Sequence, residues 1–180
     1  DPIAGYYYYN VHLRCLQAVN YLASRPEVDA SRIVVVGGSQ GGRLSLVVAG
    51  LDPRIRAALP AIAHFCNQPH FFWVTRCNGG ALPGAAKTAS ASAPSDGMDV
   101  AGAPPIADDP ALRCFAYYDP MNFAPDIRCP VVFTAGLIDP VSPPYAIWGA
   151  FNRLGSADKT LLPLDGHGHD WSAEFDRRGF

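Results

Sequence analysis

The stretch Gly37-Gly38-Ser39-Gln40-Gly41-Gly42 decides the fold of this chain. It follows the apolar, β-branched run at 33–36 (Ile-Val-Val-Val) and precedes residues 43–49, whose composition favours a helix. A strand, a turn too tight for ordinary side chains and a helix are the context that a G-x-S-x-G nucleophile elbow requires. The stretch therefore predicts an exposed nucleophilic hydroxyl on Ser39.

The glycines and Gln40 have separate tasks in such a turn. We expect a Cβ at position 37 or 41 to collide with the neighbouring strand or helix. The backbone N–H of Gln40 stands at the positive end of the following helix, where it can donate to an oxyanion. The alternative is a glycine-rich turn that binds phosphate or only packs tightly.

The length, composition and net charge describe one globular domain, 1–180, and exclude several kinds of partner. Hydrophobic residues make up 49% of the 180 residues and charged ones 17%, which is sufficient for a buried core. The net charge of -2 comes without any basic block, which argues against nucleic acid or an anionic membrane as partner. No apolar run approaches the roughly 20 residues of a membrane span.

The cysteines indicate a reducing compartment. There are five, an odd number without C-x-x-C spacing, namely Cys15, Cys66, Cys77, Cys114 and Cys129. This pattern disfavours a zinc site and a disulfide framework, so we expect reduced thiols in a cytoplasmic protein. A single Cys66–Cys77 bridge remains an alternative.

Strands and helices are expected to alternate, which is typical of an α/β fold with a mostly parallel sheet. Strands are expected at 33–36, 55–60, 131–135 and 159–164, and helices at 6–24, 43–49, 143–154 and 171–175. The run at 55–60 lacks alternation, which is typical of a strand covered on both faces. Residues 80–110 are dominated by Ala, Gly, Ser and Pro and are interpreted as a flexible insertion, either a lid or a surface loop.

Three chemically suitable residues follow three of these strands: Ser39, Asp139 and His167. The carboxyl ends of parallel strands share one edge, and the chain order serine, acid, histidine is that of α/β-hydrolases. In this interpretation His167 takes the serine proton, and Asp139 holds the imidazole tautomer.

The chain contains other candidates for the histidine and the acid. His169 competes with His167, which is preferred because it follows Gly166 directly and lies closer to the strand. Asp165 is an alternative acid, disfavoured because neighbours in a tight loop rarely face one another. The remaining histidines, His12, His64 and His70, are interpreted as surface or core residues.

Several segments together resemble carbohydrate esterase family seven, the acetyl xylan esterases and cephalosporin-C deacetylases. They are Tyr6-Tyr7-Tyr8, Arg25-Pro26-Glu27-Val28-Asp29, 37–42, 118–124, 129–131, 136–139, 143–144 and 166–167. Gln40 after the serine is the specific part. The resemblance implies an α/β-hydrolase fold and a serine esterase that removes acetyl groups from small acetylated sugars and cephalosporin-type esters through an acyl-enzyme. It also implies that no metal or cofactor is needed and that the protein is a cytoplasmic homo-oligomer.

Some family features have no counterpart in this chain. The family has an Arg-Gly-Gln motif upstream of the serine, and it has Glu after the catalytic histidine, where this chain has Gly168. In this fold several strands precede the helix at 6–24; one pairs with the strand at 33–36, and the loop after it supplies a second oxyanion donor. We therefore expect a carboxyl-terminal part of a longer polypeptide, with a bare apolar edge at 33–36.

Two other functions remain open at this point. A serine peptidase of the prolyl oligopeptidase type shares the triad order, but such enzymes usually have an aromatic residue where Gln40 stands. A non-catalytic fragment that binds a partner through its open sheet edge is the alternative from another class.

Overall fold

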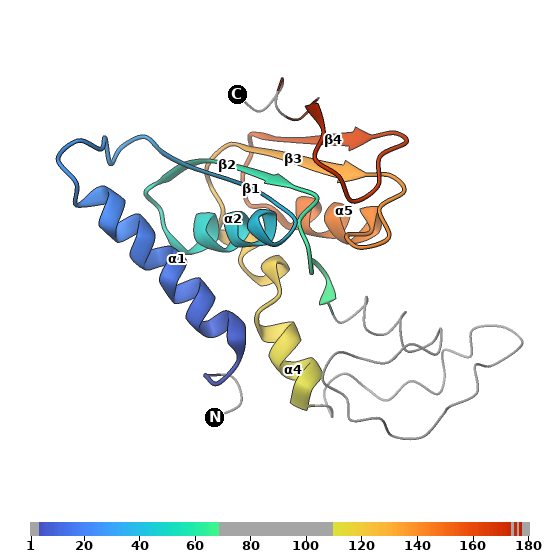
Figure 1. Cartoon of the computed structure of the whole chain (residues 1–180), viewed down its shortest axis with the longest axis horizontal. Coiled ribbons are helices and arrows are strands. Elements are labelled where there is room, and N and C mark those ends of the chain that lie inside the picture. The colour runs from blue at the N-terminus through green and yellow to red at the C-terminus, as the bar shows by residue number, and fades with distance from the viewer. Residues whose placement is uncertain (1–3, 69–109, 174, 176, 178–180) are drawn as a thin grey trace, which may run out of the picture.

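The four strands form one parallel sheet in their order along the chain. A computed structural model describes residues 4–68, 110–173, 175 and 177, and Figure 1 shows the sheet order β1-β2-β3-β4. The strands are β1 (Ile33–Gly38), β2 (Ile55–Ala61), β3 (Val131–Gly136) and β4 (Lys159–Leu164), each close to its expected position. The expected insertion at 80–110 lies outside the described residues except for its last position, which begins a helix.

The pairing register brings the carboxyl ends of the strands to one edge. Gly38 pairs with Ala61, Ala61 with Thr134, and Gly136 with Leu164. The loops that leave this edge are therefore neighbours in space although they are distant along the chain.

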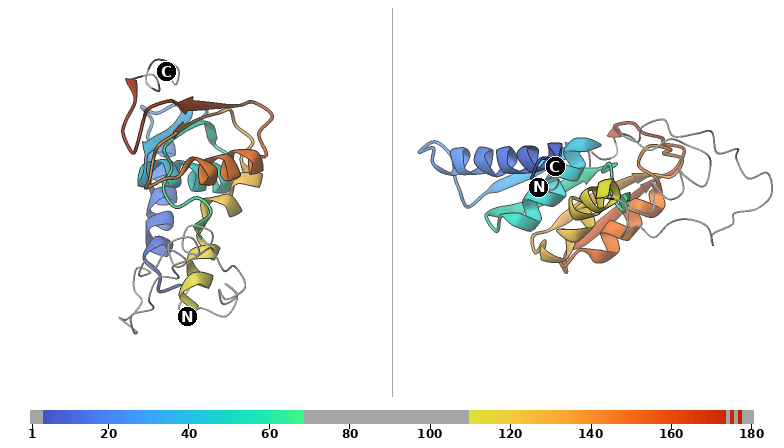
Figure 2. Two further views of the ribbon diagram at one scale, coloured as in Figure 1. Left: turned by 90° about the vertical axis from the view of Figure 1, so that its right-hand side faces the viewer. Right: turned by 90° about the horizontal axis from the view of Figure 1, so that it is seen from below.

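One face of the sheet carries the helices and the main core. The helices are α1 (Tyr7–Ala23), α2 (Gln40–Leu51), α4 (Pro110–Tyr117) and α5 (Pro144–Arg153), with 3₁₀ turns η3 (Pro120–Asn122) and η4 (Ala124–Asp126). Figures 1 and 2 show α2 and α5 on the same side of the sheet. Leu46 of α2, Phe133 of β3 and Ile147 of α5 are fully buried in this core. None of the described helices is long and apolar enough to cross a bilayer.

The other face is covered only in part within the described region. Phe175 packs there against Leu59 and Ala61, whereas Val34 and Val36 stay 49% and 45% exposed. Successive side chains of a strand point to opposite faces, so Val34 and Val36 point away from the helices. The bare apolar edge expected at 33–36 is therefore found in the described region, where β1 pairs only with β2.

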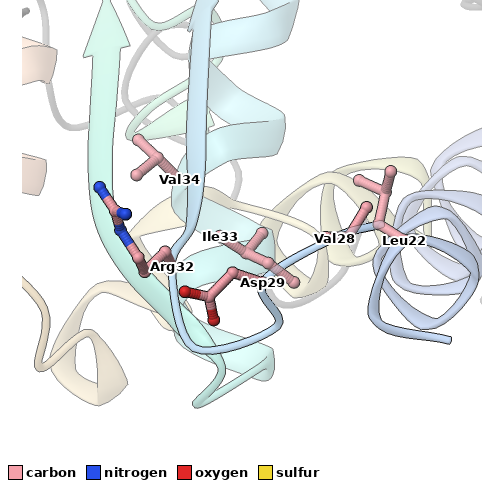
Figure 3. Close-up of a pocket in the computed structure, with 6 residues that line it drawn as sticks. All are labelled: Leu22, Val28, Asp29, Arg32, Ile33 and Val34. Carbon is pink, nitrogen blue, oxygen red and sulfur yellow. The ribbon is translucent and has the colours of Figure 1, made fainter. Parts of the chain in front are cut away.

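A shallow surface pocket of about 390 Å³ lies at the start of β1 (Figure 3). It is lined by Leu22, Val28, Asp29, Arg32, Ile33 and Val34. Ser39 follows the other end of the same strand, so this pocket lies apart from the edge where the predicted site residues meet.

His12 is a core residue, in line with one of its two expected roles. Its ring lies on α1 with only 6% exposed, at 5.8, 5.6 and 5.9 Å between centroids from Tyr8, Tyr118 and Phe123. Burial, and secondarily the charge of Arg43, lowers the pKa of His12 to about 4. The ring is therefore neutral in the folded protein at neutral pH.

We predict that a positive charge on β1, at the edge of the described sheet, lowers self-association of the chain. Val34→Lys should shift the average mass in solution towards the 19.3 kDa of one chain, because lysine opposes edge-to-edge pairing. Light scattering over a concentration series measures this. Gln17→Lys, at an exposed position of α1, adds the same charge away from the edges of the sheet. An equal effect of both substitutions, or none from Val34→Lys, contradicts the prediction.

We also predict an acid-sensitive contribution of His12 to stability. The folded pKa of about 4 lies below the ordinary 6.5, so the unfolded chain binds more protons between these values. The free energy of unfolding should therefore fall as pH drops from 6.5 to 4, by about 3 kcal/mol from this group. Urea unfolding at several pH values tests it: His12→Phe should flatten the pH dependence of the free energy of unfolding. Parallel curves for parent and His12→Phe would refute it.

Candidate active site

Ser39 has the strained backbone of a nucleophile elbow. It lies between β1 and α2 with φ 54° and ψ -115°, outside the regions that non-glycine residues usually adopt. Its N–H donates to the Ala61 carbonyl at 2.9 Å, and its carbonyl accepts from the N–H groups of Arg43 and His64, each at 3.0 Å. Three backbone hydrogen bonds from different segments thus hold the conformation in place.

Two glycines permit the tight turn, but they are not quite the expected pair. A Cβ on Gly37 would lie 2.5 Å from the Gly41 backbone, and one on Gly42 would lie 2.6 Å from the Ala61 carbonyl oxygen. The collision expected for a Cβ at 41 is wrong, because that direction is open to at least 4 Å. Gly41 matters through its backbone, which occupies the space that a side chain at 37 would need.

The hydroxyl, an imidazole and a carboxylate form a continuous hydrogen-bonded chain. His169 Nε2 lies 2.8 Å from Ser39 Oγ, and His169 Nδ1 lies 2.8 Å from Asp139 Oδ2. The three residues follow β1, β3 and β4. This arrangement is the one in which a serine hydroxyl is activated by a base that an acid orients.

Asp139 is buried and fixed by its own turn. Its Oδ1 accepts from the backbone N–H groups of Val141 at 2.7 Å and Ser142 at 2.8 Å, and its side chain has no exposed surface. Oδ2 is left to His169. The expected position of Asp139 in the site is therefore found in the structure.

The choice of His167 is wrong. Its Nδ1 is paired with Asp170 Oδ2 at 2.8 Å, its side chain is 39% exposed, and its carbonyl accepts from the Ile138 N–H at 3.1 Å. The chain after β4 reverses at Gly166, whose φ is 72°, and runs back over the end of β3 before it can reach the elbow. His169 is the histidine that arrives there. Asp165, the alternative acid, is exposed and takes no part in this network.

Gly136 explains why this loop lies so close to β3. A Cβ there would collide with the carbonyl oxygens of His167 and Gly168. The sequence contained a signal for the correct histidine: the residue after His169 is the acidic Asp170, whereas His167 is followed by Gly168. With His169 as the base, Asp170 stands at the position where the family has an acidic residue, so the departure expected at Gly168 does not apply.

Gln40 opens α2, as expected for an oxyanion donor. The first N–H groups of a helix have no acceptor in a preceding turn, so the Gln40 N–H is available next to Ser39. Its side-chain Nε2 lies 3.4 Å from the Tyr8 hydroxyl, so the side chain is turned towards α1.

A buried arginine below the elbow supports the segment after β2. Arg43 has no exposed surface; its Cζ lies 3.7 Å from the centroid of the Tyr8 ring, and Nη2 donates to the Tyr118 carbonyl at 2.6 Å. With its amide oxygen facing Arg43, Gln68 accepts from Nη1 at 2.7 Å. Burial lowers the pKa of Arg43, and Tyr8 and Asp119 oppose this effect.

Asp119 completes this support. Its carboxylate accepts from the N–H groups of Asn67 at 3.1 Å, Gln68 at 2.6 Å and Met121 at 2.9 Å. Burial raises its pKa, although these hydrogen bonds and Arg43 act in the opposite direction. Arg43 and Asp119 together thus hold residues 67–68 and 118–121, which lie on either side of the gap in the described chain, close to the elbow.

The described residues contain no group of three or more His, Cys, Asp or Glu side chains placed to hold a metal ion. Cys66 is a free, buried thiol, and burial raises its pKa. Cys77, the other half of the bridge left open by the sequence, lies outside the described residues.

Comparisons with known proteins identify relatives of this chain. A family model described as acetyl xylan esterase (AXE1) matches residues 1–79 and 104–179. The acetyl esterase Axe7A of Xylanibacter ruminicola is 33% identical over 171 residues, covering 93% of this chain and 34% of that protein.

Solved structures confirm the α/β-hydrolase fold. The acetyl xylan esterase from Paenibacillus sp. R4 has a TM-score of 0.75 and 31% identity, covering 98% of this chain and 52% of that one. Acetyl xylan esterase 1 from Thermoanaerobacterium sp. JW/SL YS485 also has a TM-score of 0.75, at 24% identity, with 99% and 53% covered. The chain thus spans about half the length of these solved proteins and about a third of Axe7A.

The family model accounts for most of the chain, and Axe7A shares a third of its aligned residues with it. The resemblance noted in the sequence is therefore confirmed, and the chain belongs to the acetyl xylan esterase family.

Proposed function

We propose that this chain is a serine esterase that removes acetyl groups from small acetylated sugars such as xylo-oligosaccharides. The observation that carries the proposal is the unbroken contact from Ser39 Oγ through the His169 ring to Asp139 Oδ2, with 2.8 Å at each step. Family membership supports the same reaction class.

The geometry supplies the acylation step. Ser39 Oγ attacks the acetyl carbonyl carbon while His169 Nε2 takes its proton, and the carbonyl oxygen becomes an oxyanion. The Gln40 N–H donates to that oxyanion. His169 then gives the proton to the leaving sugar hydroxyl, and the acetyl group remains on Ser39.

Asp139 supports both halves of the cycle. Its Oδ2 accepts from His169 Nδ1, which leaves Nε2 unprotonated towards Ser39 and stabilises the cationic ring after proton uptake. In deacylation, water takes the place of the alcohol: His169 removes its proton, acetate leaves, and Ser39 regains its hydrogen.

The substrate class follows from the relatives. Axe7A is an acetyl esterase and the solved neighbours are acetyl xylan esterases, so an acetyl ester on a xylan-derived sugar is the first substrate to test. Cephalosporin-type acetyl esters are the second class that we propose.

We predict that Ser39→Ala and His169→Ala each lower kcat for p-nitrophenyl acetate by at least about 10³-fold without unfolding, because the triad acts as a unit. His167→Ala is the matched control: it removes a nearby imidazole whose hydrogen bond, among the described residues, goes to Asp170 and not to the triad, so it should retain most of the activity. Circular dichroism confirms folding. Similar losses for His167→Ala and His169→Ala would refute the assignment.

We predict that acetyl esters are turned over and that a proline p-nitroanilide is not. An esterase built for a sugar hydroxyl as leaving group need not protonate an amine, whereas a prolyl-oligopeptidase-type enzyme must. Acetate released from acetylated xylo-oligosaccharides provides the direct measurement.

An organophosphate should form an adduct on Ser39 in the parent chain; absence of the adduct from the folded protein would favour the non-catalytic alternative.

A further inference from the structure

We propose that His64 is a positioning residue that holds the three triad loops in their relative places; this rests on the proposed function. His64 lies in the segment that follows β2. It contacts the Ser39 carbonyl, lies next to Val141 in the turn that holds Asp139, and meets the His169 ring. His64 lies beyond Ala61, the last residue of β2, so its contacts are not part of the strand pairing.

The first contact reaches the elbow. The His64 N–H donates to the Ser39 carbonyl at 3.0 Å, the same oxygen that accepts the first-turn N–H of Arg43. The elbow is thus tied to the segment after β2 as well as to its own helix.

The other two contacts come from the His64 ring. The ring faces the backbone of Val141, which opposes the lowering of the His64 pKa, and the Val141 N–H donates to Asp139 Oδ1 at 2.7 Å. It also meets the His169 ring edge to face, with 6.3 Å between centroids and 66° between planes. One side chain therefore braces the acid turn and limits rotation of the base.

The backbone on both sides of His64 is strained. Ile62, Phe65 and Asn67 have φ values of 41°, 58° and 55°. A β-branched residue such as Ile62 rarely adopts positive φ, and such conformations persist where surrounding contacts determine them. Here the Ile62 N–H donates to the Thr134 carbonyl at 3.1 Å, and the Asn67 N–H to Asp119.

The charge state of His64 suits a brace next to a base. Burial, then His169, then Arg43 lower its pKa, so the ring is neutral near pH 7. A neutral ring does not oppose the positive charge that His169 acquires when it takes the serine proton. Its buried Nδ1 has no hydrogen-bond partner in the part of the chain that the structure describes.

Two variants separate the contributions of the ring. His64→Phe keeps an aromatic ring against His169 and loses the ring nitrogens that face the Val141 backbone; His64→Gln keeps a donor and loses the ring. We expect each to lower kcat for p-nitrophenyl acetate about tenfold with KM changed less than about twofold, because misplacement of the triad affects the transition state. His167→Gln is the control and should leave both constants near those of the parent.

A spectroscopic readout does not depend on turnover. In ¹⁵N-histidine-labelled protein, the His169 Nδ1–H proton shared with Asp139 should give a downfield resonance that is shifted or broadened in both His64 variants and unchanged in His167→Gln. A parent without esterase activity would refute the proposed function, and this resonance would still test the positioning role. The positioning role is overturned if both folded variants keep the parental kcat and resonance, or if only KM rises.

Discussion

The rest of the site depends on the backbone of Ser39, held at φ 54° by hydrogen bonds from three segments. Such a conformation costs of order 1–3 kcal/mol and persists only where its surroundings enforce it. The Ala61 carbonyl, the first turn of α2 and the His64 N–H provide that enforcement. Because of this conformation, the side chain of Ser39 projects from the sheet edge towards His169.

The polar groups below the elbow help to hold the segment that contacts the Ser39 backbone. Arg43 belongs to α2 and is wholly buried, and its partners lie on the segments before and after the gap in the described chain. Asp119 binds the backbone of residues 67 and 68, a few positions from His64. A buried charged group left without its partners is costly, so this network fixes the path of the strained segment over the elbow.

The sequence allowed the strands, the elbow and the acid to be predicted, because each depends on local residue types: a β-branched run, small residues around Ser39 and an aspartate after a strand. It did not allow the histidine to be chosen. That choice depends on how far the chain after β4 travels before it reaches the elbow, which is a property of the turn at Gly166 and the contact with Gly136. How much of the second face of the sheet is covered also could not be predicted, since an apolar run does not reveal what packs on that face.

Gly136 shows how the distance between base and nucleophile is controlled. It is the last residue of β3, it pairs with Leu164, and it presents bare backbone to the loop that carries His169. The imidazole is therefore placed by the hydrogen-bond ladder between two strands rather than by the flexibility of a long loop. A slip of one residue along that ladder moves the loop by about 3.3 Å, more than the whole separation between the proton donor and its acceptor. The register of strand pairing therefore determines how accurately the imidazole and the serine hydroxyl are placed relative to each other.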